Sequence, residues 1–126
     1  MADVTNEEVE YGIVEQPQTL SREAILAAND CLMEWVDVPT WGGRIQVRGL
    51  TVREIDSIMR LSTHKNVVNT TQSAVLMFVR ACVQPKFTDL DVDDLKGKSG
   101  VVFQVVKVIS RLSGIGAEAA EEMEKN

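Results

Sequence analysis

The sequence predicts an α+β fold that is mainly α-helical and contains one β-hairpin in its N-terminal third. Several segments place apolar residues at helical spacing behind good N-capping residues, which favours short amphipathic helices. One stretch instead alternates apolar and polar residues around a Gly-Gly pair, which is typical of a hairpin. With 126 residues, of which 44% are hydrophobic, the chain has room for one small domain, and we expect it over residues 20–116.

Both ends of the chain are acidic. Residues 1–18 hold five acids and no base, whereas residues 19–116 hold ten acids and twelve bases. We therefore predict that residues 1–19 form a disordered acidic N-terminal segment. Residues 117–126 hold four acids and one base, and we expect them to form an acidic tail that frays.

The first ordered elements are a short helix and the hairpin. Ser21 is a good N-cap, and the alanine-rich run behind it predicts a helix to about Asp30. The hairpin is expected over about 32–48, with its turn at Trp41-Gly42-Gly43. In its second strand Ile45 and Val47 share one face, and Arg44, Gln46 and Arg48 share the other.

Two amphipathic helices follow the hairpin. Thr51 and Glu54 fit a capping box, and the apolar pattern behind them predicts a helix that ends near Thr63. Residues 64–70 are polar and are predicted to form a loop. The next helix is expected from about Thr71 to Val83, before Pro85.

The last third of the chain predicts two more helices. Thr88 and Asp89 can cap a short helix that ends at Gly97. Residues 100–112 are the most apolar stretch, and their β-branched residues are also compatible with a strand. The length of the stretch and the Ser113-Gly114 stop behind it favour a largely buried helix.

No constellation of residues indicates an enzyme, a cofactor or a metal. Gly97-Lys98-Ser99 lacks the first glycine and the buried strand of a phosphate-binding loop. The aspartates at 89, 91 and 93 lack the glycine and the glutamate of a calcium loop. The single histidine, His64, and the two cysteines, Cys31 and Cys82, are too few for a recognisable zinc site. We therefore expect a non-catalytic protein.

Charge and hydropathy also exclude two classes of partner. A near-neutral body with acidic ends lacks the clustered Lys and Arg that neutralise nucleic-acid phosphates. No apolar run approaches a membrane span, and the N-terminus has no signal-peptide pattern. The sequence thus favours a soluble protein that binds neither nucleic acid nor membrane.

The hairpin carries the residue types that protein interfaces favour. Trp41, Arg44 and Arg48 combine an indole with two guanidinium groups, as interface hot spots do. For Trp41, a role as an anchor that holds the hairpin on the helices is equally favoured. We expect Trp35 in the core. A second candidate surface is part of the helix from Thr71 to Val83, including Leu76 and Val79. The apolar excess of residues 100–112 also fits a partner groove, although burial in the core is favoured.

Short motifs in a collinear order over residues 20–126 resemble the tail assembly chaperones of long-tailed, siphovirus-like bacteriophages. Each motif is short and none is a catalytic signature, so the weight lies in their order and spacing. The motifs are Leu20-Ser21-Arg22-Glu23-Ala24-Ile25-Leu26-Ala27-Ala28, Glu34-Trp35-Val36-Asp37-Val38-Pro39, Trp41-Gly42-Gly43, Val47-Arg48-Gly49-Leu50-Thr51-Val52-Arg53-Glu54, Phe87-Thr88-Asp89, Lys98-Ser99, Leu112-Ser113-Gly114-Ile115-Gly116 and Glu122-Met123-Glu124-Lys125-Asn126.

The resemblance implies an assembly role without chemistry. Proteins of this family bind the long tape measure protein and keep it soluble in the host cytoplasm while tail tube subunits assemble around it. They are then released and are missing from the mature virion, and many also exist in a longer, frameshifted form. The resemblance implies the tape measure protein as partner and the tail tube protein as a further one, and it leaves self-association open. The alternative is a head–tail connector or tail completion subunit that stays in the virion.

Overall fold

The computed structural model describes residues 18–115. The predicted N-terminal segment and acidic tail therefore lie largely outside the described residues. The chain divides into two compact units, Met1–Asp30 and Cys31–Asn126, whereas the sequence predicts one domain from residue 20. Each unit is described by itself.

The described part of the first unit holds one helix, α1 (Arg22–Ala27). The Ser21 hydroxyl accepts a hydrogen bond from the Ala24 N–H at 3.0 Å, which confirms the predicted N-cap. The helix ends at Ala27, three residues before the predicted end. All its side chains are exposed, so α1 contributes nothing to a core within the described residues.

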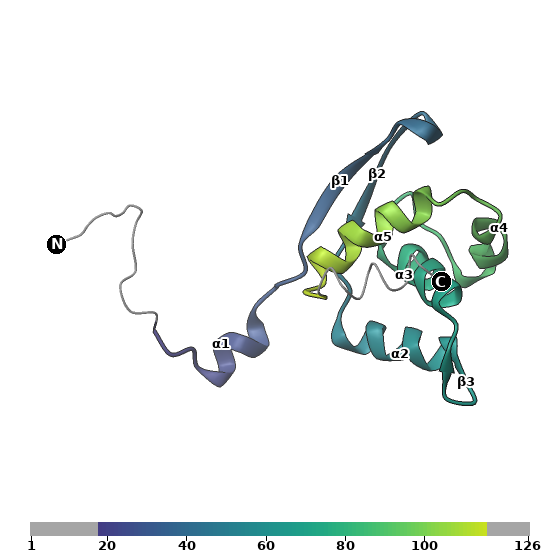
Figure 1. The fold of residues 1–126 in the computed structure, drawn as a ribbon. Helices are drawn as coiled ribbons and strands as arrows, with labels where there is room; N and C mark the ends of the chain where they lie inside the picture. The colour runs from purple at the N-terminus through teal and green to yellow at the C-terminus, as the bar shows by residue number, and fades with distance from the viewer. Residues whose placement is uncertain (1–17, 116–126) are drawn as a thin grey trace. The chain divides into compact units, whose positions relative to one another are not determined.

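The second unit begins with the predicted hairpin. Strand β1 (Met33–Val38) and strand β2 (Gly43–Arg48) pair antiparallel and are joined by a short 3-10 helix, η2 (Pro39–Trp41), as Figure 1 shows. Gly42 closes the turn at a φ of +80°, which glycine adopts without strain.

A third strand that the sequence does not predict completes this sheet. Strand β5 (Cys82–Gln84) pairs antiparallel with β2, which gives the order β1-β2-β5. The helix that the sequence predicts to Val83 therefore ends at Ala81, and Cys82 and Val83 belong to the sheet. This is α3 (Thr70–Ala81), capped by the side chain of Asn69.

Helix α2 (Val52–Ser62) carries the predicted capping box. The Glu54 N–H donates to the Thr51 hydroxyl at 3.1 Å, and the Thr51 N–H donates to the Glu54 carboxylate at 3.0 Å. The predicted loop after it is partly wrong, because strands β3 (Thr63–His64) and β4 (Val67–Val68) form a small hairpin there.

The last elements are helical, as predicted. The 3-10 helix η3 (Asp89–Asp91) has its own capping box with Thr88, and helix α4 (Val92–Lys96) follows it directly. The apolar stretch forms helix α5 (Val101–Leu112), which settles the choice between helix and strand. One face of α5 is buried, and the opposite face is exposed.

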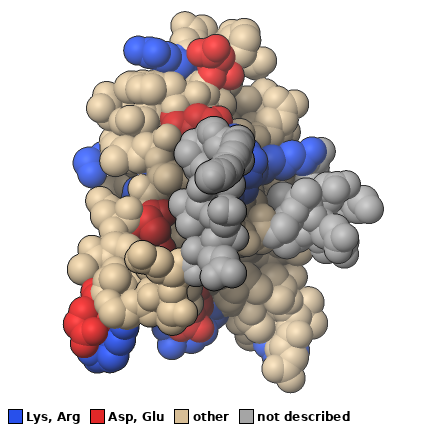
Figure 2. Space-filling model, turned by 90° about the vertical axis from the view of Figure 1, so that its left-hand side faces the viewer, with Lys and Arg blue, Asp and Glu red and all other residues tan. Residues whose placement is uncertain are grey.

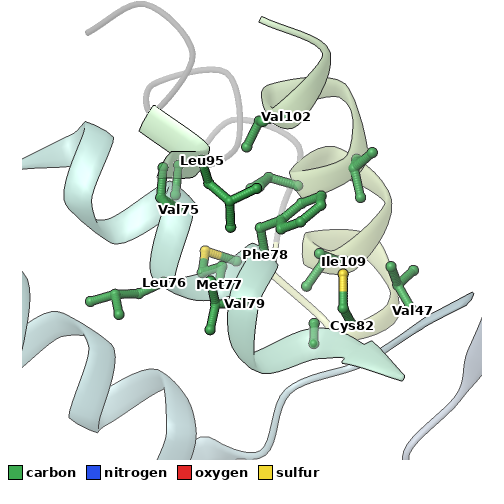
Figure 3. Packing of buried hydrophobic residues seen from close by; sticks show 14 of the residues in the cluster. Val47, Val75, Leu76, Met77, Phe78, Val79, Cys82, Leu95, Val102 and Ile109 are labelled. Atoms are coloured by element: carbon green, nitrogen blue, oxygen red, sulfur yellow. The ribbon is translucent and has the colours of Figure 1, made fainter. Parts of the chain in front are cut away.

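The core lies where α3 meets α5 and the inner face of the sheet. Nearly every residue of α3 from Ser73 to Ala81 is buried, so this helix is central and not amphipathic. Figure 3 shows core side chains that come from α3, α4, α5 and the sheet. They include Val47, Val75, Leu76, Phe78, Leu95, Val102 and Ile109.

Candidate binding site at the hairpin and helix α5

The two faces of the hairpin have different roles. Ile45 and Val47 are buried, as predicted, and on β1 the core-facing residues are Glu34, Val36 and Val38. Trp35 therefore lies on the outer face, and 42% of its surface is exposed. The expectation that Trp35 belongs to the core is wrong, because side chains alternate along a strand and its neighbours occupy the core face.

Arg44 packs on Trp35 across the strands. The Arg44 guanidinium carbon lies 4.2 Å from the centre of the indole, which is a cation–π contact. Arg44 also faces Asp37 in the strand register, one pair away from the turn of the hairpin. The outer face of the hairpin thus carries a partly exposed indole stacked under a guanidinium, a combination that protein interfaces favour.

Trp41 combines the two roles that the sequence leaves open. Its ring meets Phe78 edge-on, with 5.9 Å between the ring centres, so it anchors the hairpin to α3. At the same time 37% of Trp41 is exposed, so part of its surface remains available to a partner.

An apolar groove of about 240 Å³ lies between the hairpin and α5. Valine and proline side chains make up most of its walls, and Asp37, Thr40 and Gln104 add polar groups. One wall comes from β1 and η2, and the other from the N-terminal two thirds of α5. The lining residues are Val36, Asp37, Val38, Pro39, Thr40, Val101, Gln104, Val105 and Val108.

The predicted contact residue Arg48 is engaged inside the fold. Its guanidinium forms two hydrogen bonds with the Glu54 carboxylate, at 2.8 and 2.7 Å, and a third with the Arg80 carbonyl at 3.1 Å. These contacts tie β2 to the start of α2 and the end of α3. These contacts give Arg48 a structural role, and its contact with a partner stays a prediction.

The partner Glu54 responds electrostatically to this pairing. The hydrogen bonds from Arg48 lower the pKa of Glu54 from 4.5 to about 2, and they raise the pKa of Arg48. Since the folded state holds Glu54 ionised more strongly than the unfolded chain does, the pair stabilises the fold above pH 4.5. This stabilisation is lost as the pH falls from 4.5 to 2.

We expect Glu54→Gln to lower the free energy of unfolding at pH 7 by about 2 kcal/mol, because Arg48 keeps its charge without a counter-ion. The difference from the wild type should shrink as the pH falls from 4.5 to 2, because protonation of Glu54 then favours the unfolded chain. Urea unfolding followed by circular dichroism between pH 2 and 7 measures both effects. Asp56→Asn is the control on the same helix, because its pair with Arg60 is well exposed and contributes below about 1 kcal/mol. Equal losses in the two variants would contradict the structural role of Arg48.

The two α3 residues predicted to meet a partner lie in the core. Leu76 and Val79 are 2% and 3% exposed, so neither offers a surface in this fold. The prediction treats α3 as amphipathic, whereas α2, α4 and α5 all contact it and bury nearly all its sides. Both residues are therefore corrected from partner-binding to core residues.

Sequence reasoning did not find the groove. Its walls, β1 with η2 and α5, are more than sixty residues apart in the chain, and no local pattern joins them. The one signal was the excess of apolar residues on α5, which supplies both core and groove residues.

The other polar clusters serve capping and pairing. The Asp91 carboxylate accepts from the Thr88 N–H at 2.8 Å, and Asp89 pairs with Arg80 at 2.9 Å.

Within residues 18–115 no group of His, Cys, Asp and Glu side chains is arranged to hold a metal ion. Among the same residues no helix has the length and hydropathy of a membrane span. On the face in Figure 2, side chains of both signs occur among many uncharged residues.

Comparisons with known proteins add no relative. No family model, no curated protein and no solved structure matches this chain.

Proposed function

We propose that this chain is a non-catalytic tail assembly chaperone of a long-tailed bacteriophage. In this role it binds the tape measure protein in the host cytoplasm, keeps it soluble and helps to recruit tail tube subunits. It is released before the virion matures. The proposal starts from the collinear motifs of the sequence, and the observation that supports it in the structure is the groove between the hairpin and α5.

The groove has the chemistry that an amphipathic helix requires. A tape measure protein is expected to be a long helix whose apolar face needs cover before the tube encloses it. Helices of this kind dock by laying apolar side chains into a groove, and valines at positions 36, 38, 101, 105 and 108 line this one. Polar residues in its walls, such as Gln104, fix the orientation of the bound helix and add little to the affinity. Modest affinity suits a partner that must later be released.

The hairpin adds a second contact surface to the proposal. Trp41 follows directly on the groove residues Pro39 and Thr40, and Trp35 with Arg44 lies on the other face of the same strands. Of the contact residues predicted from the sequence, Trp41 and Arg44 therefore remain in the proposal.

Val108→Asp should weaken capture of the tape measure protein by about tenfold or more, because it buries a carboxylate against an apolar partner. The measurement is co-expression with the candidate tape measure protein, affinity capture, and size-exclusion chromatography with light scattering. Val52→Asp is the matched control, since the same change at a residue that is 85% exposed on α2 should leave capture unchanged. Circular dichroism must show that both variants are folded.

The outcomes separate the proposal from its alternative. If the tape measure protein stays insoluble beside the wild-type chain, the chaperone role fails. If capture survives Val108→Asp but fails in Arg44→Glu, the contact moves from the groove to the outer face of the hairpin. Mass spectrometry of purified virions adds an independent test, because a connector or completion subunit would be retained in the particle.

A further inference from the structure

Strand β1 leaves one edge of the sheet open. The sheet order is β1-β2-β5, and no described residue pairs with β1 on the side away from β2, as Figure 1 shows. The Gly49 N–H donates to the Leu32 carbonyl, so Leu32 faces β2. Because an antiparallel ladder alternates, Glu34, Val36 and Val38 also direct their backbone groups to β2. Met33, Trp35 and Asp37 then direct theirs to the open edge.

This edge has few of the features that protect edge strands. Native proteins block open edges with lysine, proline, bulges or inward-pointing charges. Strand β1 is six residues long and regularly paired with β2, and it holds neither lysine nor proline. Its one charge on the core-facing side is Glu34, which pairs with Arg111 of α5 at 3.0 Å.

We propose that a second copy of this chain pairs with β1, strand to strand and antiparallel, about a twofold axis at Trp35. The open edge requires an extended backbone, so a helical partner cannot satisfy it. A second copy supplies the same six residues in the same conformation. The pairing does not depend on the proposed tape measure contact.

The side chains of β1 select one register. With Trp35 opposite the Trp35 of the other copy, Met33 faces Asp37, and all outward N–H groups meet a carbonyl. A slip of the register one way sets Glu34 opposite Glu34, and like charges that face each other destabilise a sheet. A slip the other way sets Met33 opposite Pro39, which has no N–H to donate.

The twofold axis of such a pair runs through the sheet from face to face. Both grooves therefore come to lie on the same side of the joined sheet, and both outer faces on the other side. The joined grooves would offer a long helical partner a longer apolar surface than one copy does.

Two substitutions at position 35 test the backbone pairing. Trp35→Thr and Trp35→Pro both remove the indole, but only proline removes the outward N–H while the ladder to β2 stays intact. We expect the wild type and Trp35→Thr to form dimers whose dissociation constants agree within about tenfold, and Trp35→Pro to bind about a hundredfold more weakly. Sedimentation across a range of concentrations measures this, and circular dichroism verifies the folded state. A wild-type chain that stays monomeric at its highest soluble concentration, or a Trp35→Pro dimer of wild-type strength, would overturn the proposal.

Cysteine cross-linking tests the register. In a Cys31→Ser background, Trp35→Cys should form a disulfide-linked dimer on oxidation, because directly opposed residues lie about 5.5 Å apart at their Cα atoms. Burial raises the pKa of the Cys82 thiol to about 12, so this cysteine stays unreactive. Gln46→Cys is the matched control, since Gln46 faces Trp35 from β2 and is separated from its counterpart by three strand spacings, about 14 Å. Cross-linking at position 46 but not at position 35 would refute this register.

Discussion

Phe78→Ala is expected to lower the free energy of unfolding by about 3–5 kcal/mol, the usual range for a buried phenylalanine. Phe78 is 1% exposed at the centre of α3, and its ring contacts Trp41 and Phe87 at centre-to-centre distances of 5.9 and 5.5 Å. Removing the ring leaves a cavity between α3 and the elements that pack on it. Small domains are stable by about 5–15 kcal/mol, so the variant should be close to unfolding at 37 °C. Urea unfolding followed by far-ultraviolet circular dichroism measures the loss.

The same experiment needs two controls. Phe78→Leu fills more of the space and should lose less stability than alanine does. Leu90→Ala removes a leucine that is almost fully exposed on η3, and we expect it to change stability by less than about 0.5 kcal/mol. If Phe78→Ala lost no more than Leu90→Ala, the packing of α3 against Trp41 and Phe87 would be wrong.

The sequence predicts the helices well because their signals are local. The predicted Thr51–Glu54 capping box joins residues three positions apart and forms in the structure, and Thr88 caps the next helical segment as predicted, with Asp91 as the second residue of its box. The hairpin is also a local feature, since its alternation and its Gly-Gly turn lie within sixteen residues. Such signals require no knowledge of distant contacts.

Strand β5 depends on a distant contact and was therefore missed. Cys82 continues the apolar pattern of α3, and only its pairing with Val47 of β2 makes it a strand residue. The small hairpin of β3 and β4 was missed for another reason. Its turn places Lys65 and Asn66 at φ values of 51° and 65°, and this turn lacks the glycine that usually marks such conformations.

In the candidate site, too, the sequence predicts the local features but not those that depend on distant contacts. Arg44 and Arg48 occupy equivalent positions in the alternating pattern of β2, and the sequence assigns them one role. The structure separates them, because Arg48 reaches Glu54 whereas Arg44 stacks on Trp35. The groove joins β1 to α5 through tertiary packing alone, so no reading of a single segment could predict it.

Gly49→Ala is the second change with a large expected effect, and it tests how the sheet is joined to the end of α5. A Cβ atom on Gly49 would lie 2.5 Å from the Leu112 carbonyl oxygen and 2.9 Å from its carbon. Both atoms belong to the backbone of α5, which cannot rotate away as a side chain could. The segment is also fixed by the hydrogen bond from the Leu50 N–H to the Ser113 hydroxyl at 2.8 Å. We expect a loss of about 3 kcal/mol in the free energy of unfolding.

Gly43→Ala provides the matched control for this loss. Gly43 begins strand β2, which ends one residue before Gly49, and a Cβ atom on Gly43 would meet nothing within 4 Å. Since alanine also lowers the entropy of the unfolded chain, Gly43→Ala should leave stability unchanged or raise it by up to about 1 kcal/mol. Urea unfolding of the two variants thus compares one chemical change at a close backbone approach and at an open site. Equal stabilities would mean that α5 ends farther from Gly49 than the fold described above requires, whereas a selective loss in Gly49→Ala would confirm the junction.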